Sequence, residues 1–185
     1  MLTDDEVMAR LLAGLLEAAD ATGEWDMPPV LLWVVRTDDD DPGALVPFDL
    51  PDQVWDAAPL PDVLERLPTA LALAVKHGPP APIWMSEARL VGVVFMGEGW
   101  SRMSMEGPPT PTPLGSYTEP PVREARVVTG VDGSAVWHGL HVRGEAPPEV
   151  ERHPNGGGVV IDGRVVTALR GIRATILTIQ AGAMS

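Results

Sequence analysis

The chain has 185 residues, of which 45% are hydrophobic and 21% are charged, and its formal net charge at pH 7 is −13. This length and composition predict one globular domain over 1–185, and the absence of cysteine excludes disulfide bonds, thiolate zinc sites and cysteine nucleophiles. The N-terminus lacks the pattern of a signal peptide, and no apolar run approaches the ~18 residues of a membrane-spanning helix, so we expect a cytoplasmic protein without membrane contact.

The charge is unevenly placed along the chain. Residues 1–66 contain sixteen acidic residues and three arginines, whereas residues 67–185 contain ten acidic and ten basic residues. An acidic surface disfavours direct binding to nucleic-acid phosphates and to anionic membranes. Three interpretations of the acidic first third stay open: a solvated surface that promotes solubility, a surface for a basic partner, and a mimic of nucleic acid.

The first predicted element is a helix that begins after Thr3. Thr3 and Glu6 have the spacing of a capping box, in which each side chain binds the backbone N–H of the other residue. An apolar stripe at helical spacing follows, and Gly23 suits the end of the helix. The stripe comprises Val7, Met8, Leu11, Leu12, Leu15, Leu16 and Ala19.

Two strands and a helical region are expected next. The unbroken apolar run Val30–Val35 predicts a central strand that is buried on both faces. Thr37–Gly43 is an acidic turn without the ligand spacing of a calcium loop, and Ala44–Val46 suits a short second strand. Phe48–Gly78 has helical spacing interrupted by prolines, of which Pro68 must kink or split the helix.

The middle of the chain alternates apolar runs with loops. Ile83–Trp84 suits a brief extended piece, and Leu90–Met96 predicts another buried strand. We expect this strand to end at Gly97–Trp100, where the glycines predict a bend or a close backbone approach. Met103–Pro121 contains six prolines and little periodicity, so we expect a long loop there.

The clearest motif is a β-hairpin over Val122–Gly144, which we expect to pair with the Leu90–Met96 strand. Asp132-Gly133 suits a two-residue type I′ turn, in which both residues take a positive φ. With that turn, the expected opposite pairs are Val128 with Trp137, Arg126 with Gly139, and Glu124 with His141.

Side chains alternate along a strand, so the hairpin has two faces. The more apolar face is expected to pack on the core, and it comprises Ala125, Val127, Thr129, Val136, His138, Leu140 and Val142. The other face is expected to point outward, and it displays Glu124, Arg126, Trp137, His141 and Arg143.

The C-terminal part is expected to contain a loop, a short edge strand and a helix. Prolines and glycines predict a loop over Glu145–Gly158, and Val159–Ile161 suits the edge strand. Residues 163–179 predict a helix capped by Asp162, although their β-branched content leaves a strand open as an alternative. The apolar stripe of this helix is Val165, Val166, Leu169, Ile172 and Ile176.

Together these elements predict an α+β fold. We expect a mostly antiparallel sheet of four to six strands, with the N-terminal and C-terminal helices packed on one face.

Most catalytic motifs are absent or incomplete. Gly99–Met103 has the first half of a nucleophile elbow and lacks the second glycine, and Gly156–Gly158 lacks the spacing and the lysine of a phosphate loop. His138 and His141 are three residues apart on one strand and therefore point to opposite faces. We predict neither a metal site nor a cofactor.

The best candidate site is the outward face of the hairpin together with Glu98. The candidate catalytic residues are Glu98, Glu124, Arg126 and His141, and the candidate binding residues are Trp137 and Arg143. In this hypothesis Glu124 orients the imidazole, the two arginines hold an anionic group and the indole provides a stacking surface. The alternative is a solvent-facing sheet with ordinary cross-strand charge pairs, each of which contributes about 0.2–1 kcal/mol.

Three segments resemble a family of small acidic proteins from actinobacteria and their phages. They are WDMPP before a buried strand, VVFMGEGW, and REARVVTGVDGSAV followed by a final helix. The resemblance implies a cytoplasmic setting in a bacterium of high GC content or its phage, and it implies no catalytic activity.

The sequence therefore favours a non-enzymatic binding or accessory protein that acts through protein contacts. Two other functions stay open: a small hydrolase or transferase that uses the hairpin residues, and an acidic inhibitor that mimics nucleic acid. The expected partner is a protein, and self-association also stays open.

Overall fold

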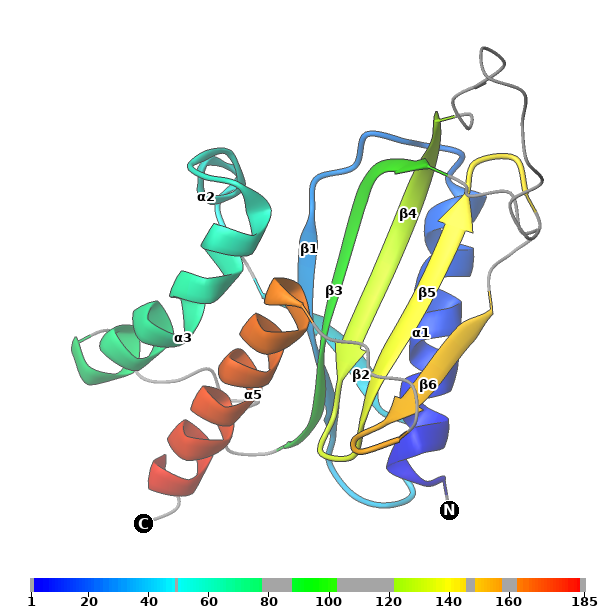
Figure 1. The fold of residues 1–185 in the computed structure, drawn as a ribbon. Helices are drawn as coiled ribbons and strands as arrows, with labels where there is room; N and C mark the ends of the chain where they lie inside the picture. The colour runs from blue at the N-terminus through cyan, green and yellow to red at the C-terminus, as the bar shows by residue number, and fades with distance from the viewer. Residues whose placement is uncertain are drawn as a thin grey trace.

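The computed structural model describes residues 2–48, 50–77, 88–102, 122–145, 149–157 and 163–183. Within this part of the chain, six strands form one antiparallel sheet in the order β2-β1-β3-β4-β5-β6, so the predicted α+β class is confirmed (Figure 1). The strands are β1 (Val30–Arg36), β2 (Ala44–Pro47), β3 (Arg89–Arg102), β4 (Val122–Val131), β5 (Ala135–Val142) and β6 (Val150–Pro154). The helices are α1 (Asp4–Ala21), α2 (Asp52–Asp56), α3 (Leu60–His77) and α5 (Arg164–Ala183).

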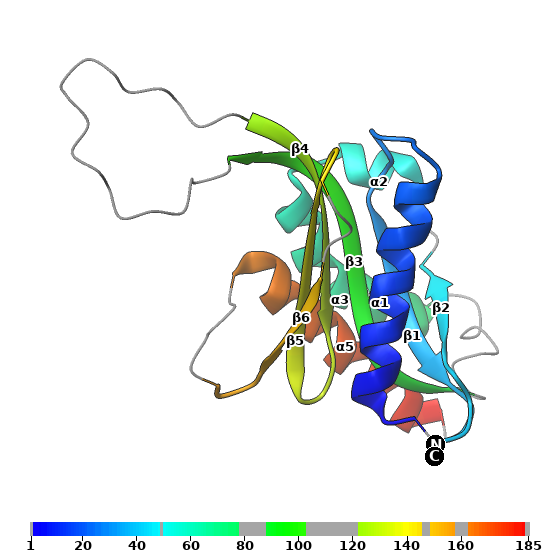
Figure 2. The same ribbon diagram turned by 90° about the vertical axis from the view of Figure 1, so that its right-hand side faces the viewer.

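The helices cover both faces of the sheet (Figure 2). Helix α1 packs on one face, whereas α3 and α5 pack on the other. The prediction that the first and last helices share a face is therefore wrong. The physical reason is that β1 and β3 carry apolar side chains on both faces, so each face needs a cover. Trp33 and Phe95 face α3 and α5, while Leu32 and Val94 face α1.

Helix α1 forms as the sequence predicts. The hydroxyl of Thr3 accepts a hydrogen bond from the Glu6 N–H at 3.2 Å, and the Glu6 carboxylate accepts one from the Thr3 N–H at 2.7 Å. The buried side of the helix consists of Val7, Met8, Leu12, Leu16 and Ala19. Burial of each larger side chain contributes about 1.5–3 kcal/mol, so this stripe fixes the helix to the sheet.

The acidic turn between β1 and β2 is organised by its own carboxylates. Asp41 accepts hydrogen bonds from the backbone N–H groups of Thr37 and Gly43, both at 2.7 Å. These bonds stabilise the charged form and lower the pKa of Asp41 to about 2. Asp38 accepts from two further backbone N–H groups of the turn. The turn is thus a structural loop, as expected.

The two long helices on the other face pack against each other. Pro68 lies inside α3 without splitting it. Residues 164–179 of the predicted C-terminal helix belong to α5, so the alternative of a C-terminal strand is wrong. Arg164 at the start of α5 forms ion pairs with Asp62 and Glu65 at the start of α3. No helix in the described ranges has both the length and the apolar character needed to cross a bilayer.

Two strands differ from the prediction. Strand β3 continues through Glu98 to Arg102 instead of ending at Gly97–Trp100, because it pairs with β4 along ten residues. Strand β6 lies within Glu145–Gly158, which had been predicted as a loop, and it pairs with β5. The predictions for Ile83–Trp84, Met103–Pro121 and Val159–Ile161 fall outside the described residues.

The hairpin is formed by β4 and β5, and β4 pairs with β3 as predicted, but the hairpin register is shifted by two residues. The observed pairs are Val131 with Val136, Val128 with Gly139 and Arg126 with His141. Neither Asp132 nor Gly133 has a positive φ, so the predicted type I′ turn is wrong. A shift of two residues keeps every side chain on its face, because side chains alternate with a period of two.

Candidate functional site

Three of the predicted site residues lie side by side on adjacent strands. Glu98 on β3 pairs with Arg126 on β4, and Arg126 pairs with His141 on β5. Two residues away from Arg126 and His141, the backbone N–H of Arg143 donates to the Glu124 carbonyl, and the side chains of these two residues form an ion pair. The structure therefore brings together five of the six predicted site residues.

This face of the hairpin is buried at Arg126, Trp137 and His141 and is exposed at Arg143, which corrects the prediction that all of it points outward. Arg126 is 0% exposed and His141 is 2% exposed. The face lies beneath α1 and beneath the segment Thr22–Pro29 that joins α1 to β1, which we call the connector. It was misassigned because its polar residues and its glycines resemble a solvent-facing pattern.

Trp25 in the connector supplies the stacking surface that had been assigned to Trp137. The guanidinium carbon of Arg126 lies 4.7 Å from the centroid of the Trp25 ring, and that of Arg143 lies 5.5 Å from it. These distances are typical of cation–π contacts. The imidazole of His141 is also close, with a ring-centroid distance of 6.0 Å.

Trp137 belongs to a different part of the molecule. Its indole N–H donates to the Asp132 carboxylate at 2.6 Å, near the β4–β5 turn. Arg152 on β6 lies over its ring at 5.7 Å. No sequence pattern joins Trp25 to the hairpin, because the two segments are about a hundred residues apart.

The Glu98 carboxylate connects the sheet to the connector. One oxygen accepts from Nε and Nη2 of Arg126, at 2.8 and 2.5 Å. The other oxygen accepts from the backbone N–H groups of Asp26 and Met27, at 2.6 and 3.0 Å. Arg126 in turn donates to the carbonyl of Glu24 at 2.8 Å. All of these are charge-assisted hydrogen bonds, which are stronger than neutral ones.

Two buried polar atoms in this cluster lack a hydrogen-bond partner: Nη1 of Arg126 and Nδ1 of His141. The nearest carboxylate oxygen to that nitrogen of His141 belongs to Asp20 at 3.5 Å, and the contact does not meet hydrogen-bond geometry. An unsatisfied buried polar group costs about 1–3 kcal/mol. Hydrogen bonding in the buried cluster beneath the connector is therefore incomplete.

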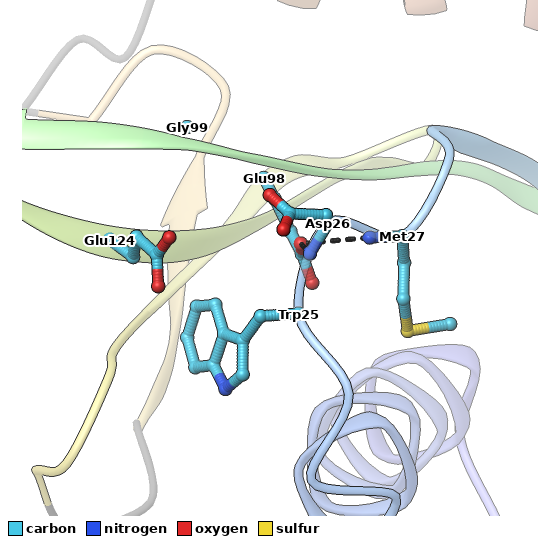
Figure 3. A pocket seen from close by; sticks show the side chains of 6 residues that line it. All are labelled: Trp25, Asp26, Met27, Glu98, Gly99 and Glu124. Atoms are coloured by element: carbon cyan, nitrogen blue, oxygen red, sulfur yellow. Dashed lines mark hydrogen bonds between the residues drawn. The ribbon is translucent and has the colours of Figure 1, made fainter.

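A surface cleft of about 360 Å³ opens beside Trp25 (Figure 3). The connector and the ends of β3 and β4 form its wall, which consists of Trp25, Asp26, Met27, Glu98, Gly99 and Glu124.

Asp26 is the one non-glycine residue with a positive φ (71°) in the described part of the chain. Such strained conformations persist where surrounding contacts impose them, and here the Glu98 carboxylate holds the Asp26 N–H.

The wall of the cleft favours a cation. It contains three carboxylates, an indole and a thioether, and no arginine or lysine among the described residues lines it, although Glu98 pairs with Arg126 and Glu124 with Arg143. Of the four candidate catalytic residues, Glu98 and Glu124 line the cleft, whereas Arg126 and His141 do not. Among the described residues, no group of three or more His, Cys, Asp or Glu residues is arranged to hold a metal ion.

A second cleft of about 160 Å³ lies near the start of α1. Its carboxylates already have partners: Asp4 binds Arg36 and Arg89, Asp5 binds Arg152, and Asp132 binds the β4–β5 turn. Hydrogen bonds from the arginines lower the pKa of Asp4. We read this cleft as a structural ion-pair network.

Comparison with known proteins gave no assignment. No family model, no curated protein and no solved structure matches the chain.

Proposed function

We propose that the protein is a non-enzymatic binding protein that acts through protein contacts and holds a cationic side chain of its partner in the Trp25 cleft. The observation that carries this proposal is the wall of the cleft, where an aromatic ring lies beside the carboxylates of Asp26, Glu98 and Glu124. Glu98 and Glu124 already pair with Arg126 and Arg143, so the exposed carboxylate of Asp26 is the one that the described residues leave without an ion pair. Aromatic and acidic side chains together favour ammonium and guanidinium groups. We place this function in the cytoplasm of an actinobacterium or its phage.

The two other functions have less support. A hydrolase or transferase needs its acid, base and anion-binding groups in contact with the substrate, but Arg126 and His141 are buried behind the wall. A nucleic-acid mimic needs an array of free carboxylates. Here Asp4, Asp5 and Glu65 pair with arginines, and Asp41 binds backbone N–H groups.

A single cationic group held in an open cleft binds weakly. A cation–π contact contributes about 0.5–2 kcal/mol and an exposed ion pair about 0.2–1 kcal/mol. Even the upper values for one cation–π contact and two ion pairs sum to about −4 kcal/mol, so the cleft alone would give a dissociation constant of about 1 mM at best. Contacts around the cleft must supply the remaining affinity and the specificity.

The test is an NMR titration with a short neutral peptide that contains one arginine, compared with the same peptide containing citrulline. The indole N–H resonance of Trp25 is assigned by its loss in the Trp25→Phe variant. We expect the arginine peptide to shift this resonance and the citrulline peptide to leave it unchanged. Glu124→Gln removes one carboxylate and should weaken binding about fivefold, or ~1 kcal/mol.

Glu17→Gln is the matched control, because Glu17 is exposed on α1, outside the wall of the cleft, and the substitution removes the same charge. It should leave the affinity unchanged. If neither peptide moves the Trp25 resonance at ~100 mM, about a hundredfold above the tightest dissociation constant expected for such a contact, the cleft is not a cation site. A protein partner captured by the wild type and by Glu17→Gln, but not by Glu124→Gln, would extend the result to the natural partner.

A further inference from the structure

We infer that the connector opens as a local unit, separately from global unfolding, and that the Glu98 carboxylate is its latch. The connector spans Thr22–Pro29 and lies over the buried Arg126 and His141. Opening would expose these two side chains and dismantle part of the cleft.

The connector is held to the sheet by side chains. Glu98 binds the N–H groups of Asp26 and Met27, Arg126 binds the carbonyl of Glu24, and the Trp25 ring lies over Arg126. In the described part of the chain, no backbone–backbone hydrogen bond joins residues 24–29 to a strand. One carboxylate and one guanidinium therefore make all of the hydrogen bonds between the connector and the sheet.

The ends of the connector suit a hinged segment. Gly23 has a φ of +66°, and a Cβ placed on it would meet no atom within 4 Å, so the chain is unobstructed at this point. Pro28 and Pro29 precede β1, and each proline ring fixes its own φ, so this end is stiff. A flexible end and a stiff end bound the movable segment.

The closed state contains unfavourable features that opening relieves. Asp26 has a positive φ, which is strained for a residue with a Cβ. The Nη1 atom of Arg126 and the Nδ1 atom of His141 are buried without hydrogen-bond partners. Opening would hydrate both nitrogens and relax Asp26, so it requires less free energy than unfolding the sheet.

The latch also determines whether the cleft exists. Trp25, Asp26 and Met27 belong to the connector and form half of the wall of the cleft. A ligand that binds the closed wall must therefore shift the equilibrium toward the closed state. This consequence rests on the proposed function, whereas the latch itself does not.

Native-state hydrogen exchange of the full chain, measured by NMR, tests the latch. We expect the Asp26 and Met27 amides to exchange about a hundredfold faster than the amides of Val94 and Val128 in the core, relative to their intrinsic rates. Their rates should not change in low concentrations of urea, because a local opening exposes little surface.

Two variants separate the latch from general destabilisation. Glu98→Gln weakens the acceptor of both connector amides and should accelerate their exchange about tenfold relative to the core amides. Glu124→Gln changes the same cleft, but Glu124 binds no connector amide in the structure, so this variant should leave the ratio unchanged. The core amides in each sample correct for any change in global stability.

The outcomes are distinguishable. Exchange of Asp26 and Met27 at the rate and urea dependence of the core amides would overturn the local opening, and equal effects of the two variants would overturn the role of Glu98. If the arginine peptide shifts Trp25 without slowing exchange at Asp26 and Met27, the coupling of the latch to the cleft is wrong. If the peptide does not bind, the proposed function fails while the exchange results still decide the latch.

Discussion

The Asp132 carboxylate determines the geometry of the connection between β4 and β5. It is 8% exposed and accepts hydrogen bonds from the N–H groups of Ser134 and Ala135, at 2.5 and 2.8 Å. Its second oxygen accepts from the indole N–H of Trp137 at 2.6 Å. One side chain thus satisfies the donors that a tight turn would otherwise pair through the backbone.

Asp132→Ala should lower the free energy of unfolding by about 2–4 kcal/mol, because it leaves the buried Ala135 and Trp137 donors without an acceptor. Urea denaturation followed by circular dichroism measures the effect. Asp40→Ala is the control: it removes an exposed acidic side chain of the β1–β2 turn, for which the structure shows no side-chain contact, and should change stability by less than ~0.5 kcal/mol. Equal effects of the two substitutions would show that Asp132 does not organise the turn.

The sequence located this turn but not its register, and the reason lies in Asp132 itself. An Asp-Gly pair signals a preference for positive φ, whereas the observed turn depends on a bond from Asp132 to Trp137, five residues away. Residue patterns do not reveal which side chain will accept such a bond. The same limit applies to Glu98, whose partners Asp26 and Met27 lie more than seventy residues away.

At the scale of elements, helix α1 sits on glycines of three adjacent strands. A Cβ on Gly92 of β3 would lie 2.8 Å from Sδ of Met8 and 2.8 Å from the carbonyl oxygen of Val131. A Cβ on Gly130 of β4 or Gly139 of β5 would lie 3.0–3.1 Å from leucine side chains of α1. The absence of side chains at these positions lets the helix approach the sheet closely.

Gly92→Ala should destabilise the fold by about 1–3 kcal/mol, because the flexible Met8 side chain can move away but the backbone carbonyl of Val131 cannot. Gly14→Ala is the matched substitution on the exposed side of α1, where a Cβ would meet nothing within 4 Å. It should stabilise the protein by up to about 1 kcal/mol through helix propensity. Thermal unfolding of both variants checks the opposite signs, and a neutral or stabilising Gly92→Ala would contradict this packing.

The same glycines explain which elements the sequence could and could not predict. Helices α1 and α5 follow from apolar periodicity and strands β1 and β3 from unbroken apolar runs, because their buried side chains are large. The hairpin face beneath α1 contains Gly130, Gly139 and Arg126, which a count of apolar residues reads as solvent-facing. Five of the six candidate residues were therefore grouped correctly, and Arg126 and His141 among them were assigned to the wrong environment.

Over the whole molecule, ion pairs join the acidic first third to the later strands and helices. Asp4 pairs with Arg89 at 2.7 Å, Asp5 with Arg152 at 2.9 Å, and Glu65 with Arg164 at 2.7 Å. The hydrogen bonds in the last pair lower the pKa of Glu65. The net charge of −13 nevertheless remains, because acidic residues outnumber basic residues two to one. Exposed acids such as Glu17, Asp40 and Asp56 contribute repulsion that no cation of the described residues offsets directly.

Net repulsion between like charges predicts that added salt raises the stability, whereas ion pairing predicts that salt lowers it. The net charge of −13 favours the first response. Exposed ion pairs contribute about 0–1 kcal/mol each, and salt weakens them, whereas it also screens a net repulsion that acts over the whole surface. The Debye length falls from about 30 Å at 10 mM to about 8 Å at 150 mM, so repulsion across the molecule should weaken most.

We expect the melting temperature to rise with NaCl over this range by about 2–4 °C, equivalent to ~1 kcal/mol. The combined variant Glu17→Gln, Asp40→Asn and Asp56→Asn removes three negative charges and should have a smaller salt response. A melting temperature that falls with salt would mean that the ion pairs between the first third and the rest of the chain outweigh the repulsion.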